Sequence, residues 1–174
     1  MTAHAAEPAL ADLAAAYAAS RSADDLARLR DAVRRSPGFD PGLDVVGAVS
    51  PLFARDAHAE VVDRIQELMP GAFLSPAAHA ALAAAHLALG DEARARAERR
   101  TQALALDSIR GTGDGTREHP WSVLRVSDEY DVLRADRRTS QQQTLVAADG
   151  ASLDRHVCDD GGEAWFDVSR LVRA

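Results

Sequence analysis

The feature that most constrains the fold is a sharp change in sequence character between residues 108 and 133. An alanine-rich sequence with helical periodicity ends there, and a sequence broken by Gly111, Gly113 and Gly115 begins. Closely spaced glycines oppose regular structure, and the segments that follow them are typical of short strands. We therefore predict a helical region over residues 1–110 and a β-rich unit over 111–174, packed together as one compact module.

The composition excludes several classes of chemistry. The 174 residues carry a net charge of −7, and all 20 basic residues are arginine. Without lysine the chain cannot form a Schiff base, a Walker-type phosphate loop or a Ser–Lys dyad. Neither half of the sequence is basic, so we expect no nucleic-acid partner.

Further absences bear on the compartment. Cys158 is the only cysteine, which rules out an internal disulfide and a thiolate metal cluster. The first apolar run lacks a basic segment before it, and acidic residues interrupt it, unlike a signal peptide. No uncharged apolar run reaches the length of about 18 residues that a membrane span needs. We expect a cytoplasmic protein with no membrane contact.

Capping residues and stop signals predict most of the helices. Ser22, Asp56, Ser75 and Asp91 are candidate N-caps, and Gly90 suits the position after a helix end. Pro8 suits the first turn of the first helix. We expect helices over residues 8–20, 22–35, 43–53, 56–69, 76–89 and 91–109.

The C-terminal part alternates strands and turns. We predict strands over residues 121–126, 144–148, 152–158 and 164–168. A short helix capped by Ser127 would follow the first strand and bury Tyr130 and Leu133. Asp149-Gly150 and residues 159–162 supply the hairpin turns. The fold class is α+β, with helical hairpins packed against a small antiparallel sheet.

One segment has the pattern of a known repeat. Between residues 78 and 108 the sequence matches that pattern in type and order at Leu82, Ala85, Gly90, Ala93, Ala97 and 104–107. The segment resembles a tetratricopeptide-type helical hairpin, which implies a scaffold that binds another protein. The subtype that clamps a partner's C-terminal carboxylate needs lysine and asparagine. This chain has neither, so that ligand is not expected.

A longer series of motifs extends from about residue 22. The motifs are Leu29-Arg30 with residues 36–41, Leu89-Gly90-Asp91, Ser108-Ile109 with residues 112–115, residues 126–133 and Trp165-Phe166-Asp167. In this order they are similar to an uncharacterised bacterial family, a domain of unknown function. The resemblance implies a shared fold and carries no reaction.

Two acidic motifs have structural explanations. The sequence GTGDGT lacks the GK[ST] of a phosphate loop and follows a helix, so we expect a linker. Asp114 can accept hydrogen bonds within that turn. Asp128, Glu129 and Asp131 would lie in a first helical turn, where carboxylates favour the helix dipole. A cation site is the alternative.

The terminal hairpin offers the sharpest candidate site. With residues 159–162 as the loop, Asp154 faces Asp167, and His156 faces Trp165. The opposite, apolar face then carries Leu153, Val157, Ala164, Phe166 and Val168. Opposed carboxylates repel unless Arg125 or Arg170, a shared proton or a metal ion neutralises them. A Gly161-Gly162 loop would shift the register and separate the pair. We place a candidate ligand or metal site on Asp114, Glu129, Asp154 and Asp167, and assign no catalytic residue and no cofactor.

Two classes of function follow. The leading hypothesis is a non-enzymatic protein-interaction or scaffold module that holds another protein in a groove between helical hairpins or along an exposed sheet edge. Candidate partner-binding residues form an arginine-rich helix face that is otherwise a solvated surface: Arg94, Arg96, Arg99 and Arg100. The alternative is a small-ligand or metal-dependent enzyme that uses the carboxylate cluster on the C-terminal sheet.

Overall fold

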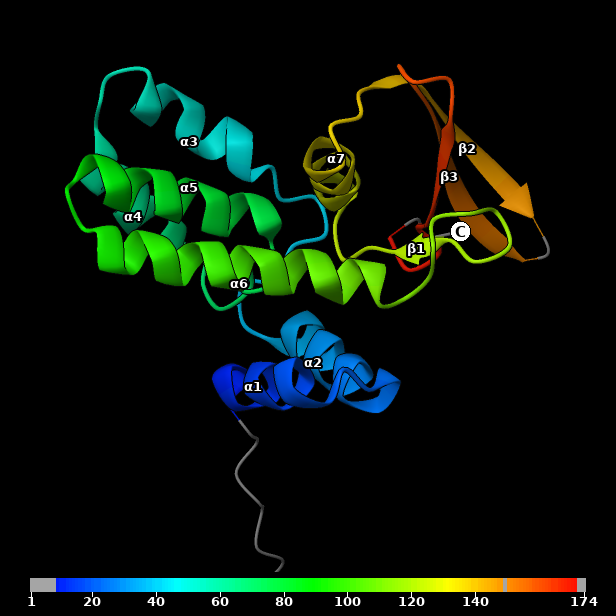
Figure 1. Ribbon diagram of the computed structural model, residues 1–174, viewed down its shortest axis with the longest axis horizontal. Coiled ribbons are helices and arrows are strands. Elements are labelled where there is room, and N and C mark those ends of the chain that lie inside the picture. Colours follow the sequence, from blue (N-terminus) through cyan, green and yellow to red (C-terminus); the bar gives the residue numbers. More distant parts are fainter. Residues whose placement is uncertain (1–8, 149, 172–174) are drawn as a thin grey trace, which may run out of the picture.

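The computed structural model describes residues 9–148 and 150–171, and these residues form seven helices and a four-stranded sheet (Figure 1). The helices are α1 (Leu10–Ser20), α2 (Ala23–Arg35), α3 (Val45–Phe53), α4 (His58–Glu67), α5 (Pro76–Ala88), α6 (Glu92–Arg110) and α7 (Val126–Ala135). The strands are β1 (Trp121–Ser122), β2 (Ser140–Ala148), β3 (Ala151–Cys158) and β4 (Glu163–Asp167). The α+β class is confirmed. Every helix in these residues is too short or too polar to cross a bilayer.

Side-chain caps begin the helices largely as predicted. Ser22, Ser75 and Asp91 each accept a hydrogen bond from a backbone N–H in the first turn. The prediction for Asp56 was wrong, because this residue adopts a left-handed backbone with φ 55°, and α4 starts after Ala57 instead. Pro8 lies outside the described residues.

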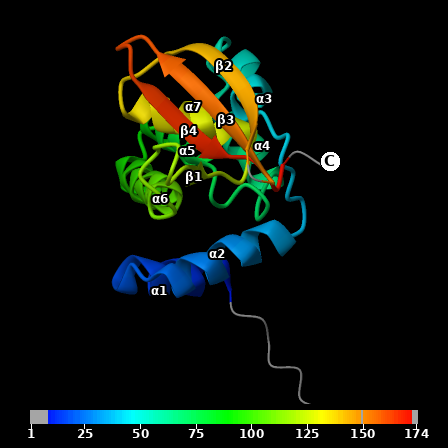
Figure 2. The same ribbon diagram turned by 90° about the vertical axis from the view of Figure 1, so that its right-hand side faces the viewer.

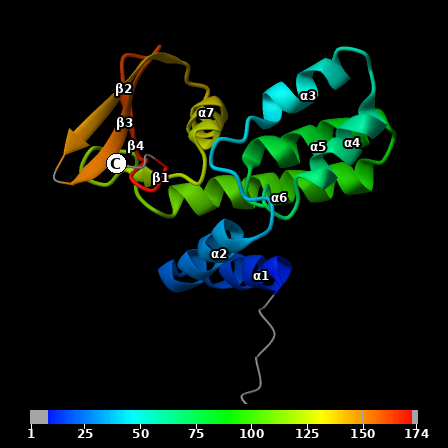
Figure 3. The same ribbon diagram turned by 180° about the vertical axis from the view of Figure 1, so that it is seen from behind.

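The helices form antiparallel hairpins around α6, the longest helix. Gly90, with φ 81°, turns the chain between α5 and α6, and α3 and α4 lie on the far side of α5 (Figures 1 and 3). The α1–α2 hairpin lies across the other side of α6. The likeness of α5–α6 to a tetratricopeptide unit stays a prediction.

The sheet has the order β1-β4-β3-β2, and it is mixed rather than purely antiparallel. β2, β3 and β4 pair antiparallel, whereas β1 runs parallel to β4. The predicted strand over 121–126 shortens to two residues because Val126 already begins α7. α7 and the β2–β3 hairpin intervene between β1 and β4, and the sheet lies over α7 (Figure 2).

The register of the β3–β4 hairpin differs by one residue from the predicted one. Asp154 pairs with Phe166, and Asp167 pairs with Leu153. Gly161, with φ 79°, gives the turn a left-handed residue, and the Cys158 N–H bonds to the Gly162 carbonyl. A turn with a left-handed residue at its third position is a common hairpin loop. The predicted Asp154–Asp167 pair therefore does not form.

The helical region and the sheet share buried surface. The apolar residues Leu106 and Ile109 of α6 pack with α7 and with Phe166 of β4. The buried Arg30 of α2 also bridges the two regions by donating to the Ser108 carbonyl at 3.0 Å and to the Ser122 carbonyl at 2.9 Å. These contacts cross the boundary near residue 110.

The loop before α5 approaches the loop after α2 so closely that only glycine fits. A Cβ atom on Gly71 would lie 2.3 Å from the Gly38 carbonyl carbon and oxygen and 2.5 Å from the Phe39 nitrogen. Backbone atoms cannot move aside as a flexible side chain can. The close contact therefore holds the two loops in one arrangement.

Replacing Gly71 with alanine should lower the free energy of unfolding by about 2 kcal/mol or more, because the new methyl group overpacks a backbone contact. Urea unfolding of both proteins measures the difference. Gly42→Ala is the matched control, since its Cβ would meet only Asp40 Oδ1 at 3.4 Å. Equal stabilities for Gly71→Ala and the control would contradict the contact.

Candidate functional site: a buried carboxylate cluster beside an open sheet edge

Hydrogen bonds at the start of α7 hold the first of its acidic side chains, Asp128, in place. Asp128 Oδ2 accepts hydrogen bonds from the backbone N–H groups of Leu124 (3.2 Å) and Arg125 (3.0 Å). The prediction that Ser127 caps this helix was wrong, because Ser127 lies inside α7 and donates to the Leu43 carbonyl. Leu133 is buried as predicted, but Tyr130 is 40% exposed.

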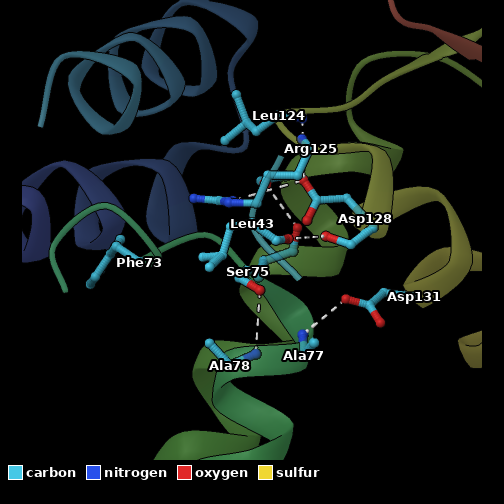
Figure 4. A network of polar contacts seen from close by, with 12 residues as sticks. Leu43, Phe73, Ser75, Ala77, Ala78, Leu124, Arg125, Asp128 and Asp131 are labelled. Atoms are coloured by element: carbon cyan, nitrogen blue, oxygen red, sulfur yellow. Dashed lines mark hydrogen bonds and ion pairs between the residues drawn. The ribbon is translucent and has the colours of Figure 1, made fainter. Parts of the chain in front are cut away.

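Arg125 is fully buried beside Asp128 (Figure 4). Its guanidinium lies 3.9 Å from Asp128 Oδ2, donates to the Gly71 carbonyl and stacks 5.1 Å from the centre of the Phe39 ring. Burial lowers the pKa of Arg125, and burial raises the pKa of Asp128 to about 6 although Arg125 opposes that rise. Among the described residues, Arg125 Nε and Nη1 and Asp128 Oδ1 have no hydrogen-bond partner.

Asp131 stabilises a different helix from its own. Its Oδ2 accepts a hydrogen bond from the Ala77 N–H in the first turn of α5 at 3.0 Å (Figure 4). Its Oδ1 pairs with Arg134 at 2.7 Å. A carboxylate at a helix N-terminus satisfies an unpaired donor and complements the dipole. Asp131 therefore fixes α7 against α5.

Glu129 and His156 form a fully buried pair between α7 and β3. Glu129 Oε2 lies 2.7 Å from His156 Nε2, and His156 Nδ1 lies 2.8 Å from Ser140 Oγ. The rings of Tyr130 and Phe166 flank the imidazole edge-on. Burial raises the pKa of Glu129 to about 7, although the hydrogen bond with His156 opposes the rise.

Three further residues extend this pair toward the surface. Gln143 Nε2 donates to Asp154 Oδ2 at 2.7 Å, and the Tyr130 hydroxyl donates to Gln143 Oε1. We call Glu129, Tyr130, Gln143, Asp154 and His156 the Glu129 cluster. It joins α7 to β2 and β3 on the inner face of the sheet.

The four predicted ligand residues do not form one site. Glu129 and Asp154 belong to the Glu129 cluster. Asp114 accepts from the backbone and hydroxyl of Thr116 within its own turn, as the motif suggested, and Asp167 accepts from Ser169 beyond β4. Among residues 9–148 and 150–171, no group of three or more His, Cys, Asp or Glu side chains could hold a metal ion.

The face of β3 that points inward was predicted wrongly from the sequence. The predicted register put Leu153 and Val157 on the face toward the core, whereas His156 contacts Glu129 of α7 and Asp154 contacts Gln143 on that face. Leu153 is nevertheless buried, at 6% exposed. The available signal was Arg155, a charged residue between two apolar ones on the face assigned to the core. Arg155 instead stacks on Trp165 at 5.9 Å, on the outer face of the sheet.

The predicted partner-binding arginines lie on the exposed surface of α6. Arg94 Nε lies 3.3 Å from Asp91, and Arg96 Nη1 lies 3.0 Å from Glu92, both on the same helix or its cap. Arg99 and Arg100 are exposed in the next turn. Their role with an acidic partner stays a prediction.

β2 is an edge strand with one open side, and the sequence predicted only the second part of it. The strand begins at Ser140, four residues earlier than predicted, and none of its nine residues is charged or proline. Within the described chain, β3 is the only strand that pairs with it. Natural edge strands usually carry charges, prolines or a cover that prevents further pairing. A small bulge near Gln142 is the only such feature within the strand.

Exposed apolar side chains lie on β2 and on the helices α3 and α7, and Tyr130 of α7 links the two groups. Leu145 of β2 is 55% exposed. Val46 of α3 and Val126 and Tyr130 of α7 are exposed as well and line one cavity of about 380 Å³. Tyr130 also bonds Gln143, whose side chain shares a face of β2 with Leu145. We call Val46, Val126, Tyr130 and Leu145 the apolar rim.

No protein-family model, no curated protein and no solved structure matches this chain. Its function is therefore argued from its own geometry.

The pKa of Glu129 gives the fold a pH dependence. Folding raises this pKa from 4.5 to about 7, so the folded state holds the proton more tightly. The contribution of Glu129 to the free energy of unfolding is complete below pH 4.5 and is lost as the pH rises through 7. Burial also raises the pKa of Asp128, so this residue changes the stability with pH in the same direction. We predict a free energy of unfolding at pH 8 that is on the order of 2 kcal/mol below its value at pH 5.

Chemical unfolding at the two pH values measures this difference. Glu129→Gln should reduce it, because the amide cannot titrate. Glu67→Gln, at an exposed position on α4, should leave it unchanged. A wild-type protein that is more stable at pH 8, or a Glu129→Gln variant with the wild-type pH dependence, would contradict the assignment.

Proposed function

We propose that this chain is a non-enzymatic protein-interaction module that binds an extended segment of another protein along β2. The observation that supports the proposal is the open, uncharged edge of nine residues. Such an edge presents backbone N–H and C=O groups in the spacing that an added strand requires. Hydrogen bonds of this kind provide affinity for many sequences.

The apolar rim would select among those sequences. Side chains of an added strand alternate between the two faces of the sheet. Those on the inner face would lie next to Leu145 and Tyr130, with Val126 beyond them on α7. The preferred partner is therefore a segment with apolar residues at alternate positions, and its charge is of little consequence along β2 itself.

The enzyme alternative has less support. It was placed on a cluster of Asp114, Glu129, Asp154 and Asp167, but Asp114 bonds Thr116, Asp167 bonds Ser169, and Asp154 pairs with Phe166 rather than Asp167. Glu129 and His156 are close enough for proton exchange, but both side chains are fully buried. A substrate could not reach them in this conformation.

Replacing Leu145 with lysine should disrupt binding, because an edge lysine opposes strand addition and removes part of the apolar rim. Tagged wild-type protein, Leu145→Lys and Leu87→Lys are used to capture partners from the native lysate, with quantification by mass spectrometry. Leu87 is a matched control, a 47% exposed leucine on α5. We expect a partner that wild type and Leu87→Lys retain and Leu145→Lys loses.

Hydrogen exchange then locates the contact in the purified complex. Backbone amides of residues 140–148 should exchange more slowly in the complex than in the free protein. Capture that is equal for wild type and Leu145→Lys, or protection confined to another element, would overturn the proposal.

A further inference from the structure

The outer face of the sheet carries a second surface, opposite the Glu129 cluster. A cavity of about 640 Å³ lies there between the loop at residues 114–118 and the side chains of all three long strands. Both tryptophans of the chain, Trp121 and Trp165, line it. Arg117, Arg138 and Arg155 line it as well.

The glycine-rich loop is a fixed wall of this cavity. The backbone N–H of Trp165 donates to the Gly115 carbonyl at 2.9 Å, and the indole Nε1 of Trp121 donates to the Gly113 carbonyl at 3.0 Å. Gly115 has φ 79°, and a Cβ there would lie 2.6 Å from the Trp121 ring. The linker predicted from the sequence therefore also holds residues 116–118 above β4.

Two of the three arginines that line the cavity are paired with acidic residues of the protein. Arg155 pairs with Glu163, and Arg138 Nε lies 3.0 Å from Asp160 Oδ2. Asp114 is occupied by its hydrogen bonds with Thr116. Glu118 is exposed next to Arg117.

Arg117 is the exception among the cavity's cations. Its guanidinium stacks 5.6 Å from the centre of the Trp165 ring. Its charge helps to lower the pKa of Glu163, but it forms no ion pair or hydrogen bond with any described residue. A stacked guanidinium is held in place by the ring, and its N–H edge stays available for a planar carboxylate. The tryptophans and Val146 offer apolar contact beside that edge.

We infer that this cavity binds a small monocarboxylate with an apolar body, in which Arg117 holds the carboxylate and the tryptophan-lined floor contacts the apolar part. A single charge suits the site, because only one cation lacks a partner and three acidic side chains line the same cavity. A dianion would meet repulsion from those acids. The site is separate from the β2 edge, with which it shares only Val146.

The two tryptophans give a direct test. Each indole N–H is hydrogen-bonded within the protein, Trp121 to the Gly113 carbonyl and Trp165 to Glu163. We therefore expect one ¹H–¹⁵N signal from each indole. Phenylacetate is titrated into the full chain. Phenylacetamide, which lacks the charge, and inorganic phosphate, which lacks the apolar body, are titrated in parallel.

We expect saturable shifts of the indole signals with phenylacetate and much weaker binding of the other two probes. Arg117→Gln should weaken phenylacetate binding by about tenfold or more, because a charge-assisted hydrogen bond is lost. Arg64→Gln, at an exposed site on α4, should bind as wild type does.

Three results would overturn the inference. They are no saturable shift with phenylacetate, equal binding of phenylacetamide or phosphate, and unchanged affinity in Arg117→Gln. Fold integrity of each variant is checked by the dispersion of its remaining amide signals. Any of these results would leave the proposal for β2 intact.

Discussion

The buried pair of Arg125 and Asp128 is the interaction on which the rest of the structure depends. Removing two charges from water is costly, and partners that are left unpaired in the interior cost several kcal/mol each. Here the guanidinium contacts the Gly71 carbonyl and the Phe39 ring, while the carboxylate caps α7. The pair therefore has low energy only when α7 and the loops around residues 39 and 71 all lie in place.

The position of α7 in turn determines the two faces of the sheet. With its first turn held by Arg125, the helix presents Glu129 to His156 of β3 and Tyr130 to Gln143 of β2. These polar contacts draw Asp154 and His156 inward and send Arg155 and Trp165 outward. One helix orientation thus produces both the tryptophan-lined cavity and the β2–β3 hairpin, in which β2 pairs with β3 on one side and is open on the other.

Local rules predicted the parts of the fold that local contacts determine. The caps at Ser22, Ser75 and Asp91 and the turn at Gly90 follow from bonds within a few residues. The predicted register of β3 and β4 was wrong, because the left-handed Gly161 changes the loop by one residue. A shift of one residue turns every side chain of a strand to the other face of the sheet. Glu129 and Asp154 were named as candidates, but His156, the partner of Glu129, was not, because it lies 27 residues from Glu129 in the sequence. The burial of Arg125 left no local signal, because the Gly71 carbonyl and the Phe39 ring that enclose its guanidinium lie 54 or more residues away in sequence, although Asp128 is only three residues away.

The most direct test of this account is calorimetric unfolding of the full chain and of Arg125→Met. If the buried pair unites the helical region with the sheet, the wild-type protein unfolds in a single transition whose calorimetric and van 't Hoff enthalpies agree. Arg125→Met, which leaves Asp128 buried without its cation, should lower the free energy of unfolding by about 3–5 kcal/mol. Two separate wild-type transitions, or a variant that is within about 1 kcal/mol of wild type, would contradict the central role of this pair.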